Sequence, residues 1–390
     1  MKKFLAVILA MLGVAAASIG LAEESAMEAG TPLSLTSPSA ILCEASTGRV
    51  IFEKNADERR PVASVNKVMT ILLTLEAIDD GRVTVSDRVT VSPRAASMGG
   101  SQAFLDAGST SKLGELLKSV IIASANDSAV ALAEYLCGAE EAFVRRMNER
   151  AQELGLENTY YVNCTGLPAQ GHYTTARDVA KLSAHLDEHP LYYQYSTIWM
   201  DEILHRGGRV TGLTNTNRLI RFYPDCDGYK TGSTNEAKYC ISATAKKDGM
   251  RLIAVVLGTP AGQTRFDEAR AMLEYGFAGY QMFSAVGEGE ALNMSVPVRL
   301  GGRDSVSVVS GGDCGLLIKK GGQGDVSLEV ALVESVHAPV CEGDVLGEIR
   351  VKQGERIVAI VPAVAGETVQ LPGIIDALIR IRDHFMLKAT

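Results

Sequence analysis

A serine and a lysine stand three residues apart in PVASVNKVMT, residues 61–70, where apolar residues begin to recur at helical spacing. A serine hydroxyl is a weak nucleophile until a neighbouring base takes its proton, and residues i and i+3 of a helix have Cβ atoms about 5–6 Å apart. Ser64 is therefore a candidate nucleophile with Lys67 as its base. The alternative is that Ser64 is an ordinary helix N-cap. A second Ser-x-x-Lys, Ser109 to Lys112, shows that the spacing alone does not identify a nucleophile.

Two further polar motifs follow along the chain. Ser124-Ala125-Asn126 lies between two apolar helical segments, where a hydroxyl and a carboxamide can both face a cleft. Lys230-Thr231-Gly232-Ser233 enters a strand pattern, and Gly232 would let a substrate backbone approach closely. Taken singly, each motif is explained better by capping or by a turn. The three together, in this order, are the signature of the penicillin-interacting serine enzymes.

A lysine can act as the base only when it is neutral. Its usual pKa of about 10.4 must then fall by several units, which burial and a second nearby cation both favour. We expect Lys67 to lie at the base of a cleft with Lys230 as that second cation.

The elements that must position these residues can be predicted from periodicity. Residues 40–54 indicate two strands joined by a Ser46-Thr47-Gly48 turn, and helical patterns dominate from 64 to about 186. AKYCISATAK and MRLIAVVLGT predict a β-hairpin, and RFDEARAMLEYGFAGYQMF predicts a helix beside it. We expect a sheet completed by strands from both ends of this region, with a helical subdomain inserted between them.

The C-terminal part has a different pattern. Residues 284–293 are a linker candidate, and 291–372 show short alternating runs between glycine-rich turns, which predicts a small all-β domain. Residues 373–390 return to helical spacing with apolar and polar residues on opposite faces. This segment is either a helix docked on the preceding domain or one that lies at a membrane surface.

The N-terminus and the composition bear on location and partners. Residues 1–22 have two lysines, an apolar run and small residues before an acidic pair, which predicts a secretory signal cleaved after Ala22; an uncleaved anchor is the alternative. The formal net charge is −8 and no Lys/Arg-rich run is present, so we expect no nucleic-acid partner. The seven cysteines include no C-x-x-C pair and do not indicate a disulfide framework.

On PVASVNKVMT, SANDSA, GHYTTARD, DGYKTGSTNEAKYC and RLIAVVLGT, the chain resembles the low-molecular-mass penicillin-binding proteins that act as D-alanyl-D-alanine carboxypeptidases. The resemblance covers nearly everything after the signal. Its departures are small: Asn66 stands before the lysine where threonine is commoner, and Ser233 follows the Lys-Thr-Gly. Neither removes a group that the chemistry requires.

The resemblance implies an α/β fold: a β-lactamase/transpeptidase-like domain over 34–283, made of an antiparallel sheet with an inserted helical subdomain. The all-β domain of 291–372 and the amphipathic, membrane-associating helix of 373–390 would follow. The implied protein is exported, lies outside the cytoplasm and is peripherally associated with the cell membrane.

The resemblance also implies a reaction. The enzyme would remove the terminal D-alanine from peptidoglycan stem peptides through an acyl-enzyme on the serine, would bind β-lactams as inhibitors, and would need no cofactor. The implied roles are nucleophile for Ser64, general base for Lys67, proton relay for Ser124, substrate carbonyl binding for Asn126, substrate binding for Lys230, Thr231, Gly232 and Arg265, with a main-chain oxyanion hole at Ser64 and Ser233.

Two rival functions remain open. A serine β-lactamase shares the three motifs, and its class A form uses a glutamate-positioned water for deacylation. Glu153 and Glu157 lie in about the right stretch, although ELGLENTYYVNCTGLP around them follows the carboxypeptidase pattern. A non-catalytic penicillin-binding sensor is the other rival, and deacylation kinetics would separate all three.

A metal site is not expected at the two histidines that lie four residues apart, His185 and His189. The text is HLDEH rather than HExxH, and Pro190 follows at once. Histidines in the last turn of a helix are favoured by its dipole.

Overall fold

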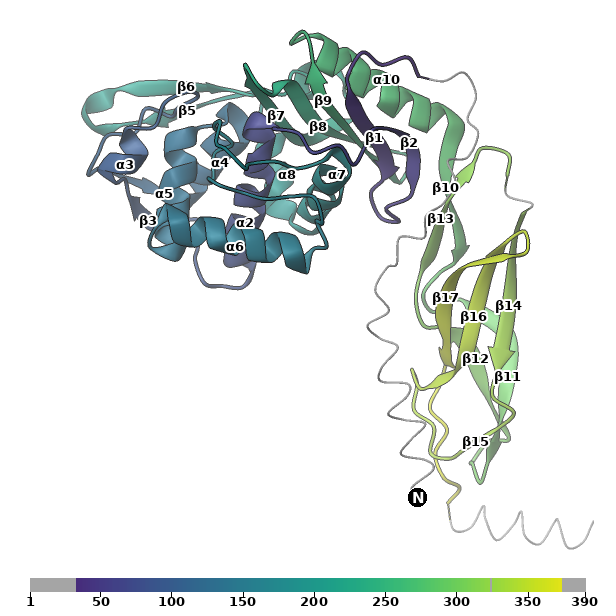
Figure 1. Ribbon diagram of the computed structural model, residues 1–390. Helices are drawn as coiled ribbons and strands as arrows, with labels where there is room; N and C mark the ends of the chain where they lie inside the picture. Colours follow the sequence, from purple (N-terminus) through teal and green to yellow (C-terminus); the bar gives the residue numbers. More distant parts are fainter. Residues whose placement is uncertain (1–32, 323–324, 374–390) are drawn as a thin grey trace, which may run out of the picture.

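The computed structural model describes residues 33–322 and 325–373, and its first layer is a five-stranded antiparallel sheet (Figure 1). Strands from both ends of the N-terminal region build it in the order β2-β1-β9-β8-β7. This confirms the expected arrangement, in which the helical part is inserted between the two sets of strands. The strands are β1 (Ser39–Glu44), β2 (Val50–Lys54), β7 (Cys226–Thr234), β8 (Lys238–Lys247) and β9 (Met250–Thr259).

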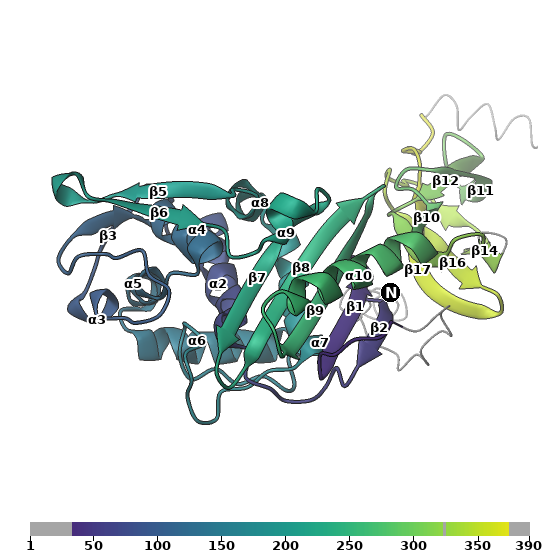
Figure 2. The same cartoon turned by 90° about the horizontal axis from the view of Figure 1, so that it is seen from above.

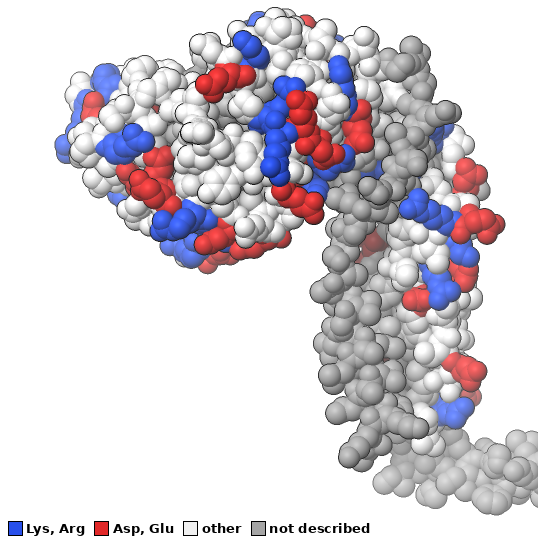
Figure 3. Space-filling model, in the orientation of Figure 1, with Lys and Arg blue, Asp and Glu red and all other residues white. Residues whose placement is uncertain are grey.

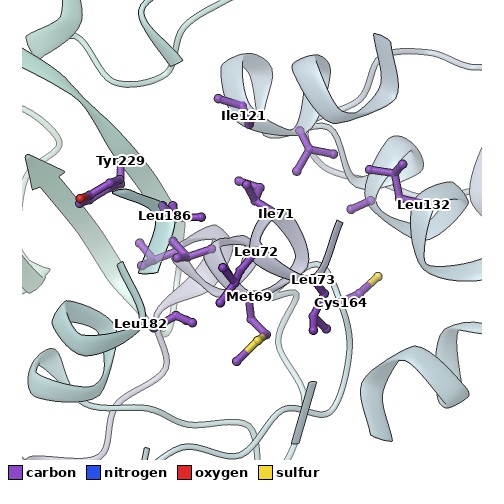
Figure 4. Packing of buried hydrophobic residues seen from close by; sticks show 14 of the residues in the cluster. Met69, Ile71, Leu72, Leu73, Ile121, Leu132, Cys164, Leu182, Leu186 and Tyr229 are labelled. Carbon is purple, nitrogen blue, oxygen red and sulfur yellow. The ribbon is translucent and has the colours of Figure 1, made fainter. Parts of the chain in front are cut away.

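The segment between β2 and β7 forms the helical subdomain. Its central helix, α2, is buried on nearly all sides, because apolar residues occupy almost every position from Val68 to Leu75. Figure 4 shows side chains of α2 surrounded by Ile121, Leu186 and Tyr229, which come from three other elements. The elements are η1 (Ala63–Asn66), α2 (Lys67–Asp79), β3 (Arg88–Thr90), α3 (Pro93–Ala96), β4 (Thr110–Lys112), α4 (Leu113–Ala123), α5 (Asn126–Cys137), α6 (Glu140–Glu153), α7 (Ala176–Ala184), η2 (His185–Glu188), α8 (Pro190–Ser196), β5 (Met200–Leu204), η3 (Arg206–Gly208), β6 (Val210–Thr214) and α9 (Leu219–Phe222).

Both faces of the sheet are covered. On β9, Ala254 and Val256 pack in the cluster that includes α10 (Thr264–Gly279), whereas Val255 and Leu257 pack in the cluster of α2. Alternate side chains of a strand point to opposite faces, so a strand covered on both sides needs the unbroken apolar run seen here. Figure 2 shows α10 lying across the sheet. Because β7 is the last strand, one of its edges is left without a partner strand in the described part of the chain.

Helix α10 ends earlier than the sequence suggests. We expected helix through Phe283, but Tyr280–Val286 form strand β10, which pairs with β13. Tyr280 and Met282 pack in the cluster of α10, whereas Phe283 packs in the cluster of the C-terminal sheet. This alternation of apolar side chains between two clusters requires a strand, although the same residues continue the helical spacing of α10.

The linker candidate at 284–293 is therefore mostly strand. Its first residues complete β10, and its last begin β11 (Ala291–Arg299), which leaves Gly287–Glu290 between them. A six-stranded sheet in the order β14-β16-β17-β12-β11-β15 follows and extends to one side of the helical subdomain (Figure 1). The strands of this part are β12 (Ser305–Ser310), β13 (Cys314–Lys319), β14 (Val326–Leu332), β15 (Val336–His337), β16 (Val345–Gln353) and β17 (Arg356–Ala365).

Two segments predicted from the sequence lie outside the described residues: the signal, 1–22, and all but Gly373 of the amphipathic helix, 373–390. Among the residues that are described, the helices are all too short or too polar to cross a membrane. On the face seen in Figure 3, acidic and basic side chains lie interspersed over both the helical and the β-rich parts.

Candidate active site

Ser64 and Lys67 are in direct contact. The Nζ of Lys67 donates a hydrogen bond of 2.9 Å to the Oγ of Ser64. The alternative reading of Ser64 as a helix N-cap is wrong: Ser64 lies inside the short 3₁₀ helix η1, whose N-cap is Val62, and α2 starts only at Lys67. The sequence pattern suggested a cap because the apolar spacing begins at Val65, but the serine hydroxyl is bonded to the lysine and to no helix N–H.

Lys67 is fully buried beneath Ser64. Its ammonium nitrogen also donates to the main-chain carbonyl of Thr165 at 2.6 Å. Burial disfavours the charged form and lowers the pKa of Lys67 to about 7. A large part of this lysine is therefore neutral near pH 7 and able to accept a proton.

Lys230 is the second buried cation of the site. Its pKa is lowered well below the usual value, first by burial, then by repulsion from Lys67 and Arg265. Burial is the largest cause that lowers the pKa of both lysines, and the repulsion between the two cations disfavours the charged form of each. The two lysines are thus close enough to influence each other, as expected for Lys230 as the second cation of the site.

Ser124 and Asn126 lie at the junction of α4 and α5. Ser124 is the C-cap of α4 and has a positive φ of 62°, a backbone conformation that is costly for a residue other than glycine. Both the Oγ of Ser124 and the Oδ1 of Asn126 are buried without a hydrogen-bond partner among the described residues. The amide nitrogen of Asn126 donates to the carbonyl of Gly99 at 2.6 Å, which leaves Oδ1 as its free end.

Such unpaired buried oxygens are uncommon, because each costs about 1–3 kcal/mol. Backbone strain also tends to persist at functional sites, where the rest of the fold holds the strained residue in place. Ala63, directly before Ser64, also has a positive φ, of 49°. Two strained residues and two unpaired oxygens thus belong to the two motifs that carry Ser64 and Ser124.

Strand β7 brings the third motif against η1. A Cβ atom on Gly232 would lie 2.5 Å from the carbonyl oxygen of Val62 and 2.8 Å from the backbone nitrogen of Ser64. Only glycine fits at this contact, which explains its place in the motif. Thr231 is buried and donates to the hydroxyl of Thr216 at 2.8 Å, whereas Ser233 is exposed.

Arg265, in the first turn of α10, reaches the same strand. Its Nη1 donates to the carbonyl oxygen of Gly232 at 2.9 Å and to that of Cys240 at 3.4 Å. Its Nε is buried without a partner among the described residues, and burial lowers the pKa of its guanidinium. The structure therefore brings Arg265 to the strand of Lys230 and Thr231.

A loop that we had not assigned to the site completes the surroundings of Lys67. The side chain of Asn163 accepts hydrogen bonds from the backbone of Thr165 and of Gly166, and this turn presents the Thr165 carbonyl to Lys67. Gly166 has a φ of +78°, and a Cβ there would lie 2.0 Å from the carbonyl oxygen of Ala63. Asn66 ties the same loop down through the carbonyl of Asn163.

The residues considered for a β-lactamase or for a metal site, Glu153, His185 and His189, are paired with other side chains. Glu153 is paired with Arg146 and Arg150 at the end of α6, and the hydrogen bond from Arg146 is the largest cause that lowers its pKa to about 2. His185 contacts Glu188 and His189 contacts Asp79, so each histidine has its own carboxylate. The second Ser-x-x-Lys lies at the surface, and its last three residues form strand β4 (Thr110–Lys112), in which Thr110 and Lys112 are exposed. Lys112 is also the N-cap of α4.

Comparisons with known proteins agree with this geometry. Residues 25–261 match the family model described as D-alanyl-D-alanine carboxypeptidase, and residues 280–371 match the one described as penicillin-binding protein 5, C-terminal domain. The chain is 40% identical over 343 residues to D-alanyl-D-alanine carboxypeptidase DacF of Bacillus subtilis (strain 168), covering 88% of each protein. It is 32% identical over 356 residues to D-alanyl-D-alanine carboxypeptidase DacC of Escherichia coli (strain K12), covering 89% of this chain and 87% of that relative.

A solved structure is similar over both parts of the chain. Penicillin-binding protein 5 of Haemophilus influenzae superposes with a TM-score of 0.75 at 29% identity, covering 87% of this chain and 99% of that one. The three motifs, the transpeptidase-like fold and the two family matches lead to one conclusion. The chain belongs to the D-alanyl-D-alanine carboxypeptidase family, the serine peptidases of peptidoglycan metabolism.

Proposed function

We propose that this protein removes the terminal D-alanine from peptidoglycan stem peptides through an acyl-enzyme on Ser64. The observation that carries the proposal is the 2.9 Å contact between the Oγ of Ser64 and the Nζ of a fully buried Lys67. A buried lysine with a lowered pKa, bonded to a partly accessible serine, has the arrangement of an activated nucleophile and its base.

The first half of the reaction forms the acyl-enzyme. Lys67 takes the proton of Ser64, whose oxygen bonds to the carbonyl carbon between the two terminal D-alanines. The backbone N–H groups of Ser64 and Ser233 receive the negative charge that develops on the carbonyl oxygen, and such a donor is typically worth about 3–4 kcal/mol. The carbon–nitrogen bond then breaks, and Ser124 relays the proton from Lys67 to the departing amine. In the second half, water attacks the ester carbon and Lys67 accepts its proton; the bond between this carbon and the Oγ of Ser64 then breaks, and Lys67 returns the proton to Oγ.

The same groups account for recognition of the substrate. The Oδ1 of Asn126 is unpaired and buried, and the carboxamide of this residue binds the peptide on the acyl side. Lys230, Thr231 and Arg265 bind the terminal carboxylate, and Gly232 lets the strand and η1 meet beside it. A carboxylate bound next to Lys230 would favour the charged form of this lysine and so oppose the effect of its burial.

D-Alanine release from Nα,Nε-diacetyl-L-Lys-D-Ala-D-Ala, measured between pH 5 and pH 9, tests the proposal. We expect kcat/KM to fall about tenfold per pH unit below the pKa of Lys67, because a protonated lysine cannot accept the serine proton. The rate should rise through a midpoint near pH 7 and then level off. An absence of D-alanine release would contradict the function, and a rate independent of pH from 5 to 9 would contradict the role of Lys67.

The time course of penicillin binding separates the rivals. A carboxypeptidase should hold a benzylpenicillin adduct while still releasing D-alanine from the peptide. A β-lactamase would instead lose the adduct quickly and consume the penicillin, and a sensor would hold the adduct without releasing D-alanine.

We also propose that the protein works outside the cytoplasm, at the outer face of the cytoplasmic membrane. The support is the signal pattern of residues 1–22 and the amphipathic pattern of residues 373–390, with the β-rich region of 291–372 keeping the catalytic domain, 34–283, away from the lipid. In flotation with anionic lipid vesicles, a form of residues 23–390 should rise with the vesicles, whereas a form that ends at 372 should not. Equal flotation of the two forms would contradict the membrane role of the tail.

A further inference from the structure

A shallow pocket of about 20 Å³ lies beside Ser64. We call it the Glu236 pocket. Three segments form it: the residues just before Ser64, the loop that presents Thr165, and the turn between β7 and β8. Its lining residues are Pro61, Val62, Ala63, Gly166, Leu167, Pro168, Ala169, His172, Thr234 and Glu236.

The direction of β7 determines which part of the substrate reaches this pocket. Lys230 and Thr231 precede Ser233 on the strand, and Thr234 follows it. An extended peptide can bind along the free edge of a sheet as an added strand. If its terminal carboxylate lies at Lys230 and Thr231 and its scissile carbonyl at the N–H of Ser233, the residues before the two D-alanines must lie towards Thr234 and Glu236.

The lining combines apolar surface with one charge. Glu236 is exposed and makes no hydrogen bond or ion pair with any residue in the described ranges. His172 is held by Asn66, with 2.9 Å between Nε2 and Oδ1, and burial lowers the pKa of its imidazole to about 4, so it is neutral near pH 7. Leu167, Pro168 and the residues before Ser64 supply the apolar part.

This composition fits a side chain with a hydrocarbon stem and a terminal amine. Long cationic side chains lay their methylene groups on apolar surface and keep the charged end in water, where an exposed carboxylate can pair with it. An acidic side chain would be repelled by Glu236, and a purely apolar one would leave Glu236 without a partner. The pocket thus selects by charge at its outer end.

We propose that the Glu236 pocket binds the amine-bearing side chain of the stem-peptide residue that precedes the two D-alanines, with Glu236 pairing to its ammonium group. The proposal rests on the function given above and names a specificity residue for it. Glu236 takes no part in the acyl transfer itself.

Two substrates that differ in one charge test the assignment. Nα-acetyl-L-Lys-D-Ala-D-Ala keeps the side-chain amine free, and Nα,Nε-diacetyl-L-Lys-D-Ala-D-Ala blocks it. Glu236→Gln should lower kcat/KM about two- to fivefold for the free amine, the range of an exposed ion pair, and leave the diacetyl peptide unchanged. Glu236→Lys should reverse the preference of the wild type. Glu288→Gln, which removes an exposed carboxylate in the turn between β10 and β11, is the matched control and should change neither rate.

The outcomes distinguish this inference from the function on which it rests. If the wild type cleaves both peptides and Glu236→Gln leaves their ratio unchanged, the pocket assignment is wrong and the carboxypeptidase function stands. An equal fall for both peptides would show a structural role for Glu236 and would also overturn the assignment. If the wild type releases D-alanine from neither peptide, both proposals fail together.

Discussion

Replacing Lys67 with methionine should slow the acylation of Ser64 by benzylpenicillin about 10²–10⁴-fold, the usual contribution of a general base. Methionine fills a similar volume without an amine, so the Ser64 hydroxyl loses the only side chain bonded to it in the described structure. The site is buried and apolar around α2, and we therefore expect the fold to survive the change. The rate constant of acylation, followed by stopped-flow fluorescence or quenched mass spectrometry, measures the effect.

The second Ser-x-x-Lys of the chain provides the matched control. Lys112→Met removes the same group from the same motif, but Lys112 is exposed at the start of α4. It should acylate at the wild-type rate. A Lys67→Met variant that folds and acylates within a few-fold of the wild type would contradict the assignment of Lys67 as the base.

Gly232→Ala should reduce kcat/KM about 100-fold or more. The new Cβ would lie 2.5 Å from the carbonyl of Val62 and 2.8 Å from the nitrogen of Ser64, so β7 and η1 must separate. This movement would shift Ser64 relative to the N–H of Ser233, and a displacement of about 1 Å in an active site can cost about 10²-fold in rate. Peptide hydrolysis and the acylation rate are the measurements, with circular dichroism to confirm the fold.

A glycine of another strand serves as the control for this substitution. Gly212, in β6, has no atom within 4 Å of the position of an added Cβ, and alanine there should leave kcat/KM unchanged. If Gly232→Ala retains wild-type activity, the close contact between β7 and η1 is not what positions Ser64.

The three motifs could be predicted from the sequence because their function lies in side chains of known chemistry in a fixed order. In the proposed mechanism Ser64, Lys67, Ser124, Asn126 and Lys230 each supply a reacting or binding group, and the structure places Lys67 against Ser64 and close to Lys230. What the sequence could not show was the backbone geometry between them. Ser64 looked like an N-cap because a 3₁₀ turn and an α-helix begin with the same apolar spacing.

The contribution of the loop around Thr165 was missed for a related reason. Lys67 is held there by a main-chain carbonyl, which every residue has, so no residue type marks it. The one local signal was Asn163-Cys164-Thr165-Gly166, where an asparagine and a glycine favour a turn and the glycine adopts a positive φ. Strand β10 was misjudged as helix because its side chains alternate between two clusters that only the folded chain brings together.

The most direct test of the central claim is mass spectrometry of the protein without its signal, mixed with benzylpenicillin and sampled over time beside a Ser64→Ala variant. The account predicts a persistent increase by the mass of one penicillin, located by peptide mapping to Ser64 and absent from the variant. An adduct on another residue, or an equal adduct on Ser64→Ala, would contradict the claim that Ser64 is the nucleophile.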